Sequence, residues 1–127
     1  MQRRIAGIGA IIMLLAVALG AFGAHVLEPV IQDSIETYKT GVQYHMIHGI
    51  AMILVALAAG TWGDSNKLRW AARLFLIGIV LFSGSLYLLS VAGWRWLGPI
   101  TPLGGVSFIA GWLMLALSAW GQTGKSK

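Results

Sequence analysis

The stretch TGVQYHMIHGIAMILVALAAGTWG, residues 40–63, decides the fold because it is mostly apolar and contains no charged residue. Three further charge-free stretches cover residues 5–27, 74–94 and 96–124. Each reaches the roughly 20 residues that an α-helix needs to cross a hydrocarbon core about 30 Å thick. The apolar runs are continuous rather than alternating, which excludes a transmembrane β-barrel. We therefore expect an all-α membrane protein, a bundle of four transmembrane helices with spans at about 5–27, 42–62, 70–92 and 102–121.

The composition agrees with this fold class. Of the 127 residues, 57% are hydrophobic and only 10% are charged, whereas globular proteins carry about 25% charge. The length indicates a single domain, residues 1–127. Cysteine is absent, which excludes disulfides, a thiol nucleophile and a thiolate metal site. The net charge of +5 comes from basic residues scattered at helix ends. This distribution indicates that the basic residues orient the helices in the membrane rather than bind nucleic acid.

The basic residues predict which way the helices cross the membrane, because cationic residues stay on the cytoplasmic side of short loops. With both termini inside, the inner face holds seven basic residues, Arg3, Arg4, Lys67, Arg69, Arg73, Lys125 and Lys127. The outer face keeps only Lys39 and Arg95. Residues 1–20 resemble a secretory signal, but we expect them to be retained as the first span. The prediction is a multi-pass protein with cytoplasmic N- and C-termini.

This orientation gathers the polar side chains in the outer half of the bundle. All three histidines and all three tyrosines fall there or in its loops. The candidate pocket or ligand residues are His25, Tyr44, His48, Ser83, Ser85 and Tyr87. The outer loop is expected to form a short amphipathic helix at about 29–40, with Pro29 in its first turn and a break at Gly41.

Small residues are the expected packing contacts, since transmembrane helices associate through close approach rather than hydrophobic exclusion. Ala16, Gly20 and Ala24 recur every fourth position in the first span. The full set of packing candidates is Ala16, Gly20, Ala24, Gly84, Gly104, Gly105 and Gly111.

Four interpretations of the histidines remain open. His25, His45 and His48 could bind Zn²⁺ or Cu, or His25 and His48 could ligate a haem. The polar rings could line a path for protons or small solutes. Alternatively His48 hydrogen-bonds Tyr87, Ser83 or a backbone carbonyl and fixes helix register. No catalytic residue is predicted, because the sequence has no HExxH, no GxSxG and no evident Ser-His-Asp set.

Four motifs carry a resemblance to a known family: LGAFGAH (19–25), TGVQYHMIH (40–48), LFSGSLYLL (81–89) and TPLGGVSFIAGW (101–112). In combination they resemble the YgdD/YwdK-type family of small four-helix bacterial inner-membrane proteins, a family of unknown function. The resemblance covers nearly the whole chain and implies a location in the bacterial inner (plasma) membrane. The family pattern falls on Gly20, Gly23, His25, Gly41, Tyr44, His48, Ser83, Gly84, Ser85, Tyr87, Pro102, Gly104 and Gly105. His45 lies outside this pattern, which favours His25 with His48 over a His45–His48 pair. The resemblance implies no activity or cofactor.

The sequence thus favours a non-enzymatic structural or accessory membrane protein with a polar His/Tyr/Ser pocket in its outer half. The alternative is a metal-binding or small-solute transport protein that uses His25, Tyr44 and His48. The expected partners are the lipid bilayer and either further copies of the chain or another membrane protein.

Overall fold

The computed structural model describes residues 2–125, with side chains as far as Gly121. In chain order its elements are α1 Gln2–Phe22, η1 Gly23–Leu27, η2 Gln32–Ser34, α2 Ile35–Trp62, α3 Asn66–Gly78, η3 Ile79–Ser83, α4 Gly84–Ala92, η4 Arg95–Leu97 and α5 Thr101–Lys125. The segments η1 and η3 are single π-helical turns that continue α1 and join α3 to α4, whereas η2 and η4 are short 3-10 turns.

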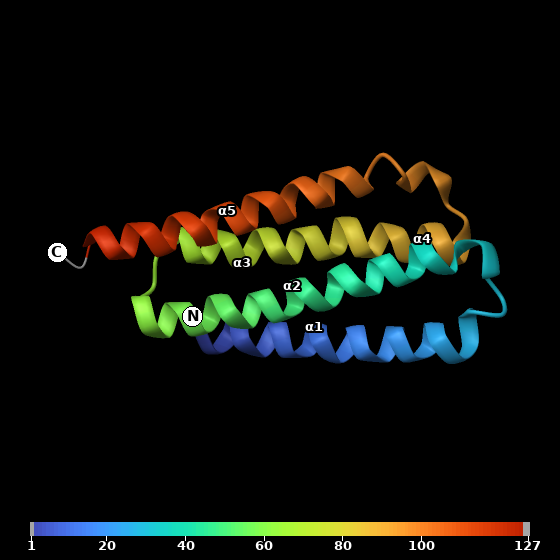
Figure 1. The fold of residues 1–127 in the computed structure, drawn as a ribbon, viewed down its shortest axis with the longest axis horizontal. Helices are drawn as coiled ribbons and strands as arrows, with labels where there is room; N and C mark the ends of the chain where they lie inside the picture. Colours follow the sequence, from blue (N-terminus) through green and yellow to red (C-terminus); the bar gives the residue numbers. More distant parts are fainter. Residues whose placement is uncertain (1, 126–127) are drawn as a thin grey trace.

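Four helical segments are long and apolar enough to cross a membrane: Gln2–Leu27, Gln32–Trp62, Asn66–Ala92 and Arg95–Gly121. They correspond in order to the four spans expected from the sequence and end at the same residues, but each begins several residues earlier. The segments run alternately in opposite directions, and α1 begins at the same end of the bundle as α5 ends (Figure 1). The predicted all-α, four-helix fold is confirmed.

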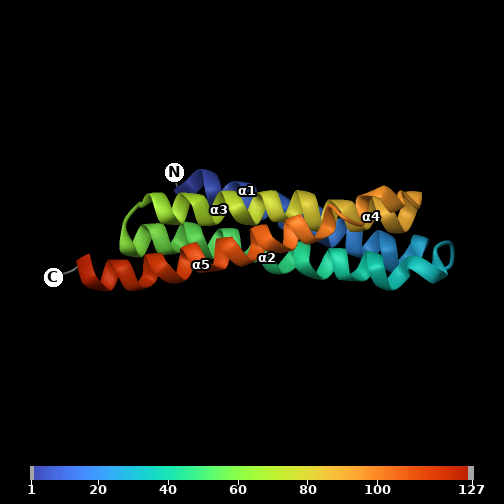
Figure 2. The same cartoon turned by 90° about the horizontal axis from the view of Figure 1, so that it is seen from above.

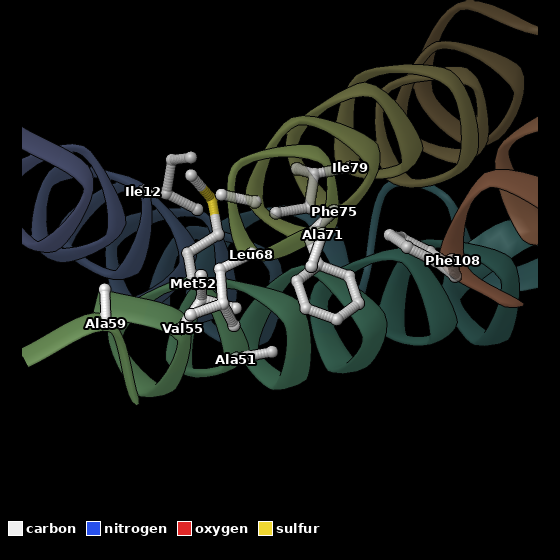
Figure 3. Packing of buried hydrophobic residues seen from close by; sticks show 11 residues of the cluster. Ile12, Ala51, Met52, Val55, Ala59, Leu68, Ala71, Phe75, Ile79 and Phe108 are labelled. Carbon is white, nitrogen blue, oxygen red and sulfur yellow. The ribbon is translucent and has the colours of Figure 1, made fainter. Parts of the chain in front are cut away.

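Helix α2 is the centre of the bundle. It packs against α1 on one side and against α3, η3 and α4 on the other, while α5 packs mainly against α3 and η3. Helices α1 and α5 accordingly lie on opposite sides in Figure 1, and Figure 2 shows the same bundle from above. The largest buried side chains of the core come from α2 and α3, namely Met52, Val55, Leu68 and Phe75 (Figure 3).

The structure differs from the sequence prediction in the outer loop. There is no separate amphipathic helix at 29–40: residues 32–34 form the turn η2, and α2 begins at Ile35. Nor is there a break at Gly41, through which α2 continues to Trp62. Gly41 allows close packing instead, because a Cβ there would lie 3.0 Å from Cε1 of Tyr87.

The packing candidates divide into two groups. Ala16 is fully buried, and a Cβ added at Gly20 would lie 3.3 Å from Val42. An added Cβ at Gly104 would overlap the backbone of Phe82, and one at Gly111 would lie 2.7 Å from the ring of Phe75. At these positions a small residue, glycine or alanine, lets the helices approach.

The other packing candidates are not at close contacts. A Cβ at Gly105 would meet nothing within 4 Å, and one at Gly84 would meet only the Ile79 carbonyl oxygen at 4.0 Å. Ala24 is exposed. Gly105 follows Gly104 by one residue, so it lies about 100° around α5 and faces away from η3. Spacing along the sequence selects a helix face only when the position of the neighbouring helix is known.

Among the residues used to predict orientation, Lys127 and the side chain of Lys125 lie outside the described residues. Arg3, Arg4, Lys67, Arg69 and Arg73 all lie at the end of the bundle where α1 and α3 begin. Lys39, near the start of α2, and Arg95, in η4, belong to segments at the opposite end of the bundle (Figure 1). The distribution of basic residues between the two ends is therefore as expected.

Candidate functional site

The candidate site is built on the first half of α2, towards the end of the bundle where α1 ends. Tyr44, His45 and His48 share neighbouring surface of this helix because residues three and four positions apart lie side by side. Their environments nevertheless differ: His45 and His48 are 5% and 3% exposed, whereas Tyr44 is 38% exposed. The two histidines also bind different helices.

His48 takes part in two hydrogen bonds, one at each ring nitrogen. Its Nδ1 lies 2.8 Å from the backbone oxygen of Tyr44, one turn earlier in α2. Its Nε2 lies 3.0 Å from Nε1 of Trp112 in α5. The indole nitrogen can only donate, so Nε2 of His48 accepts and the ring proton resides on Nδ1. His48 is therefore a neutral imidazole with both nitrogens engaged inside the protein.

Aromatic rings surround this imidazole. The His48 ring stacks on Phe108 with centroids 3.6 Å apart and planes 11° from parallel. Phe75 and Trp112 lie 5.5 Å and 5.8 Å from it. Tyr44 packs 4.7 Å from Phe82, and Phe82 lies 5.6 Å from Phe108. We call these six residues the aromatic cluster: Tyr44, His48, Phe75, Phe82, Phe108 and Trp112. It joins α2, α3, η3 and α5.

A second group of rings joins α1, α2 and α4 and is called the tyrosine cluster: Tyr38, His45 and Tyr87. A hydrogen bond of 2.8 Å links Nδ1 of His45 to the hydroxyl of Tyr87. The Tyr38 hydroxyl donates to the backbone oxygen of Leu19 over 2.5 Å, and the two tyrosine rings lie 5.2 Å apart. The ring of Tyr38 occupies the space beside Gly23, where an added Cβ would overlap it.

The serines of the candidate site bind neighbouring backbone and side chains. Ser83 is fully buried, and its hydroxyl donates to the backbone oxygen of Gly41 over 2.7 Å. The Ser85 hydroxyl donates to the backbone oxygen of Phe82 over 2.8 Å and lies 2.6 Å from the hydroxyl of Thr101. Such bonds satisfy polar groups that lipid cannot. The Ser83 bond ties η3 to α2, and the Ser85 contact with Thr101 ties α4 to α5.

His25 stands apart from the other two histidines. It lies exposed in η1, at the end of the first span, and none of the ring contacts or hydrogen bonds of the described residues involves it. Within residues 2–125, no three His, Cys, Asp or Glu side chains lie close enough together to hold a metal ion. The structure thus places Tyr44 and His48 in the aromatic cluster and Tyr87 in the tyrosine cluster. Ser83 and Ser85 bond to neighbouring backbone and to Thr101, and His25 lies apart from both clusters.

The sequence interpretation missed the two rings that define the environment of His48. Trp112 lies near the middle of the fourth span, which indicates a packing residue, and a buried indole N–H usually finds a hydrogen-bond partner. Phe108 lies one turn before Trp112 and therefore on the same face of α5. Tyr38 lies in the segment 29–40, for which the sequence predicts an amphipathic helix, and it is not among the candidate site residues. In each case the signal is a ring that carries a polar group or lies close to one, because such a group needs a hydrogen-bond partner when it is buried.

Comparison with known proteins agrees with this membrane fold. A family model described as "Protein of unknown function (DUF423)" matches residues 19–105. The UPF0382 membrane protein YwdK of Bacillus subtilis is 51% identical over 113 residues, which cover 88% of this chain and 92% of that protein. A UPF0382 membrane protein of Staphylococcus haemolyticus is 44% identical over 114 residues, covering 89% and 92%. No solved structure matches.

The region that the family model matches contains every residue of the two ring clusters except Phe108 and Trp112. The alignments with the two relatives cover nearly the whole length of each relative. The relatives are membrane proteins by name, and this chain has four helices of the length and apolarity that a membrane requires. We conclude that the chain is an all-helical membrane protein and belongs to the DUF423 family.

Proposed function

We propose that this protein is a non-enzymatic structural or accessory membrane protein, in which the histidines, tyrosines and serines hold the four spans in register. The observation that supports this most directly is the state of His48. Both of its ring nitrogens are already in hydrogen bonds, to Tyr44 and Trp112. A metal, a haem or a proton relay would need one of these nitrogens and would first have to break an internal bond.

The remaining polar groups support the same function. The hydroxyls of Ser83 and Ser107 donate to backbone oxygens of other helices, Gly41 and Leu74, over 2.7 Å each. Among the described residues, no buried side-chain nitrogen or oxygen lacks a hydrogen-bond partner. Chemistry on a substrate usually needs a polar group that is free to engage it. Here most of the buried polar side chains make contacts between helices, whereas Ser90 bonds to the Tyr87 backbone oxygen within α4.

Metal content tests this proposal. The protein is purified in mild detergent without chelators, and its metal content and absorption spectrum are measured. We expect less than one tenth of an equivalent of Zn, Cu or Fe and no haem band, together with an unchanged melting temperature when Zn²⁺ or Cu²⁺ is added. A ligand at 100 times its Kd would instead stabilise the native state by about 2.7 kcal/mol. Near-stoichiometric metal that is lost in both His25→Ala and His48→Ala would overturn the proposal.

We further propose that the protein lies in the bacterial inner (plasma) membrane with both termini in the cytoplasm. The support is the charge difference between the two ends of the bundle, because basic residues are retained on the cytoplasmic side. Arg3, Arg4, Lys67, Arg69 and Arg73 lie at the end where α1 and α3 begin, together with one acidic residue, Asp64. The other three acidic residues, Glu28, Asp33 and Glu36, lie at the opposite end with only two basic residues, Lys39 and Arg95.

The absence of cysteine makes this orientation directly testable with single-cysteine variants. Val30, in the loop before η2, is 73% exposed, and Asp64, in the linker between α2 and α3, is also exposed. A membrane-impermeant thiol reagent added to intact spheroplasts should label Val30→Cys and should label Asp64→Cys only after permeabilisation. The reverse pattern would show that the termini lie outside.

A further inference from the structure

A groove lies between α1 and α3 at the end of the bundle where both helices begin. It has a volume of about 420 Å³. Its floor includes Met52 of α2 and Ala72 of α3, both buried, and Figure 3 shows the Met52 side chain extending from α2 towards Ile12 of α1. Apolar side chains of Ile5, Ile8 and Leu76 also line the groove. The groove exists because α2 separates α1 from α3.

Three arginines, Arg4, Arg69 and Arg73, line the same groove. Two of them are held in place by neighbours without losing their charge. Nη1 of Arg69 donates to Oδ1 of Asn66 over 3.0 Å, and the Arg73 guanidinium lies 5.1 Å from the centroid of the Trp70 ring. Each guanidinium has five N–H donors, so most of their donors remain available.

These arginines have no anionic partner within the described part of the chain. The ion pairs found there both involve Lys39, at the other end of the bundle. The nearest acidic residue along the chain is Asp64, in the linker before α3, and it forms no ion pair with them. Three positive charges therefore converge on an apolar groove without internal neutralisation.

The chemistry of the groove fits one class of molecule. Arginine recognises phosphate through paired N–H donors, and basic pockets between transmembrane helices bind anionic lipid headgroups. The apolar walls beside the arginines suit an acyl chain, which a soluble phosphate lacks. We propose that the groove between α1 and α3 binds an anionic phospholipid, with its phosphate at Arg4, Arg69 and Arg73 and part of an acyl chain against Ile5, Ile8 and Leu76.

Native mass spectrometry of the full chain in detergent tests this. The protein is mixed with equal amounts of phosphatidylglycerol and phosphatidylcholine, and the retained lipid is identified. The wild type is expected to retain phosphatidylglycerol preferentially. Each arginine near a charged lipid surface contributes about fivefold in affinity. In the Arg69→Gln/Arg73→Gln variant the ratio of retained phosphatidylglycerol to retained phosphatidylcholine should therefore fall by more than about tenfold. An excess of inorganic phosphate should not displace the lipid, since it cannot occupy the apolar part of the groove.

Two matched controls separate the groove from general surface charge and from folding. Arg3→Gln/Lys67→Gln removes the same charge from the same end at positions that do not line the groove, and it should keep the preference. Ile8→Trp should reduce lipid retention by filling the groove, whereas Ile11→Trp, on the same helix but outside the groove, should not. Circular dichroism establishes that each variant is helical before its lipids are compared. Equal retention of the two lipids by the wild type, or equal losses in the groove variant and its charge control, would overturn the proposal.

Discussion

The Gly104→Val variant is expected to lower the free energy of unfolding by about 3 kcal/mol, at the upper end of the usual cost of overpacking a well-packed contact. A Cβ at position 104 would overlap the backbone nitrogen of Phe82 and lie 2.8 Å from its Cα. Backbone cannot rotate away as the end of a side chain can, so α5 would have to move from η3. That movement would also disturb the stacking of Phe108 on His48. Thermal unfolding in detergent, followed by circular dichroism, measures the effect.

Gly105→Val is the matched control for this experiment. It places the same side chain one residue later in α5, where an added Cβ meets nothing within 4 Å. Valine is also a slightly better helix former than glycine, so the melting temperature should stay the same or rise. Equal destabilisation by the two variants would show that α5 does not pack against η3 through Gly104.

His48→Ala is expected to destabilise the protein by about 3 kcal/mol. The substitution removes a buried ring that stacks on Phe108 and leaves a cavity, which costs several kcal/mol for aromatic side chains. It also leaves the Trp112 N–H without its acceptor. His25→Ala is the comparison, because His25 is exposed and surface substitutions usually change stability by less than about 0.5 kcal/mol. A loss at His25 as large as that at His48 would contradict the placement of these rings.

A double-mutant cycle isolates the bond between the histidine and the tryptophan. Trp112→Phe keeps a ring in α5 but removes the N–H that His48 accepts. If the bond exists, the effects of His48→Ala and Trp112→Phe on the free energy of unfolding should fall short of additivity by roughly 0.5–1.5 kcal/mol. Strict additivity would mean that the two side chains act independently, and it would remove the main support for the proposed function.

The fold was predictable because it depends on a pattern that extends along the whole chain. Four charge-free stretches separated by charged groups leave few arrangements, since backbone polar groups in lipid must be satisfied within helices. The outer loop was predicted less well. Ile35 and Tyr38 have the spacing of an amphipathic helix, and the structure gives them helical geometry, but as the first turns of α2. Periodicity indicates that a segment is helical, but it does not show whether that segment is a separate helix or the first turns of the next one.

The candidate site was predictable only in part, because its composition depends on contacts between helices. The grouping of Tyr44 with His48 follows from their positions in one helix. The partner of His48 does not, since Trp112 is 64 residues away in the sequence. Likewise, His25 and His45 are both histidines near the outer end of a span, yet only His45 is buried. Which face of a helix meets its neighbour is determined by packing, and one sequence does not specify that packing.

The neutral state of His48 also bears on how the aromatic cluster responds to a voltage across the membrane. A transmembrane potential acts on charges, with about 2.3 kcal/mol per elementary charge for each 100 mV crossed. His48 lies within a span but, as an uncharged acceptor for Trp112, it offers no charge on which the potential can act. The aromatic cluster, which joins α2, α3, η3 and α5, should therefore keep the same geometry in energised and de-energised membranes.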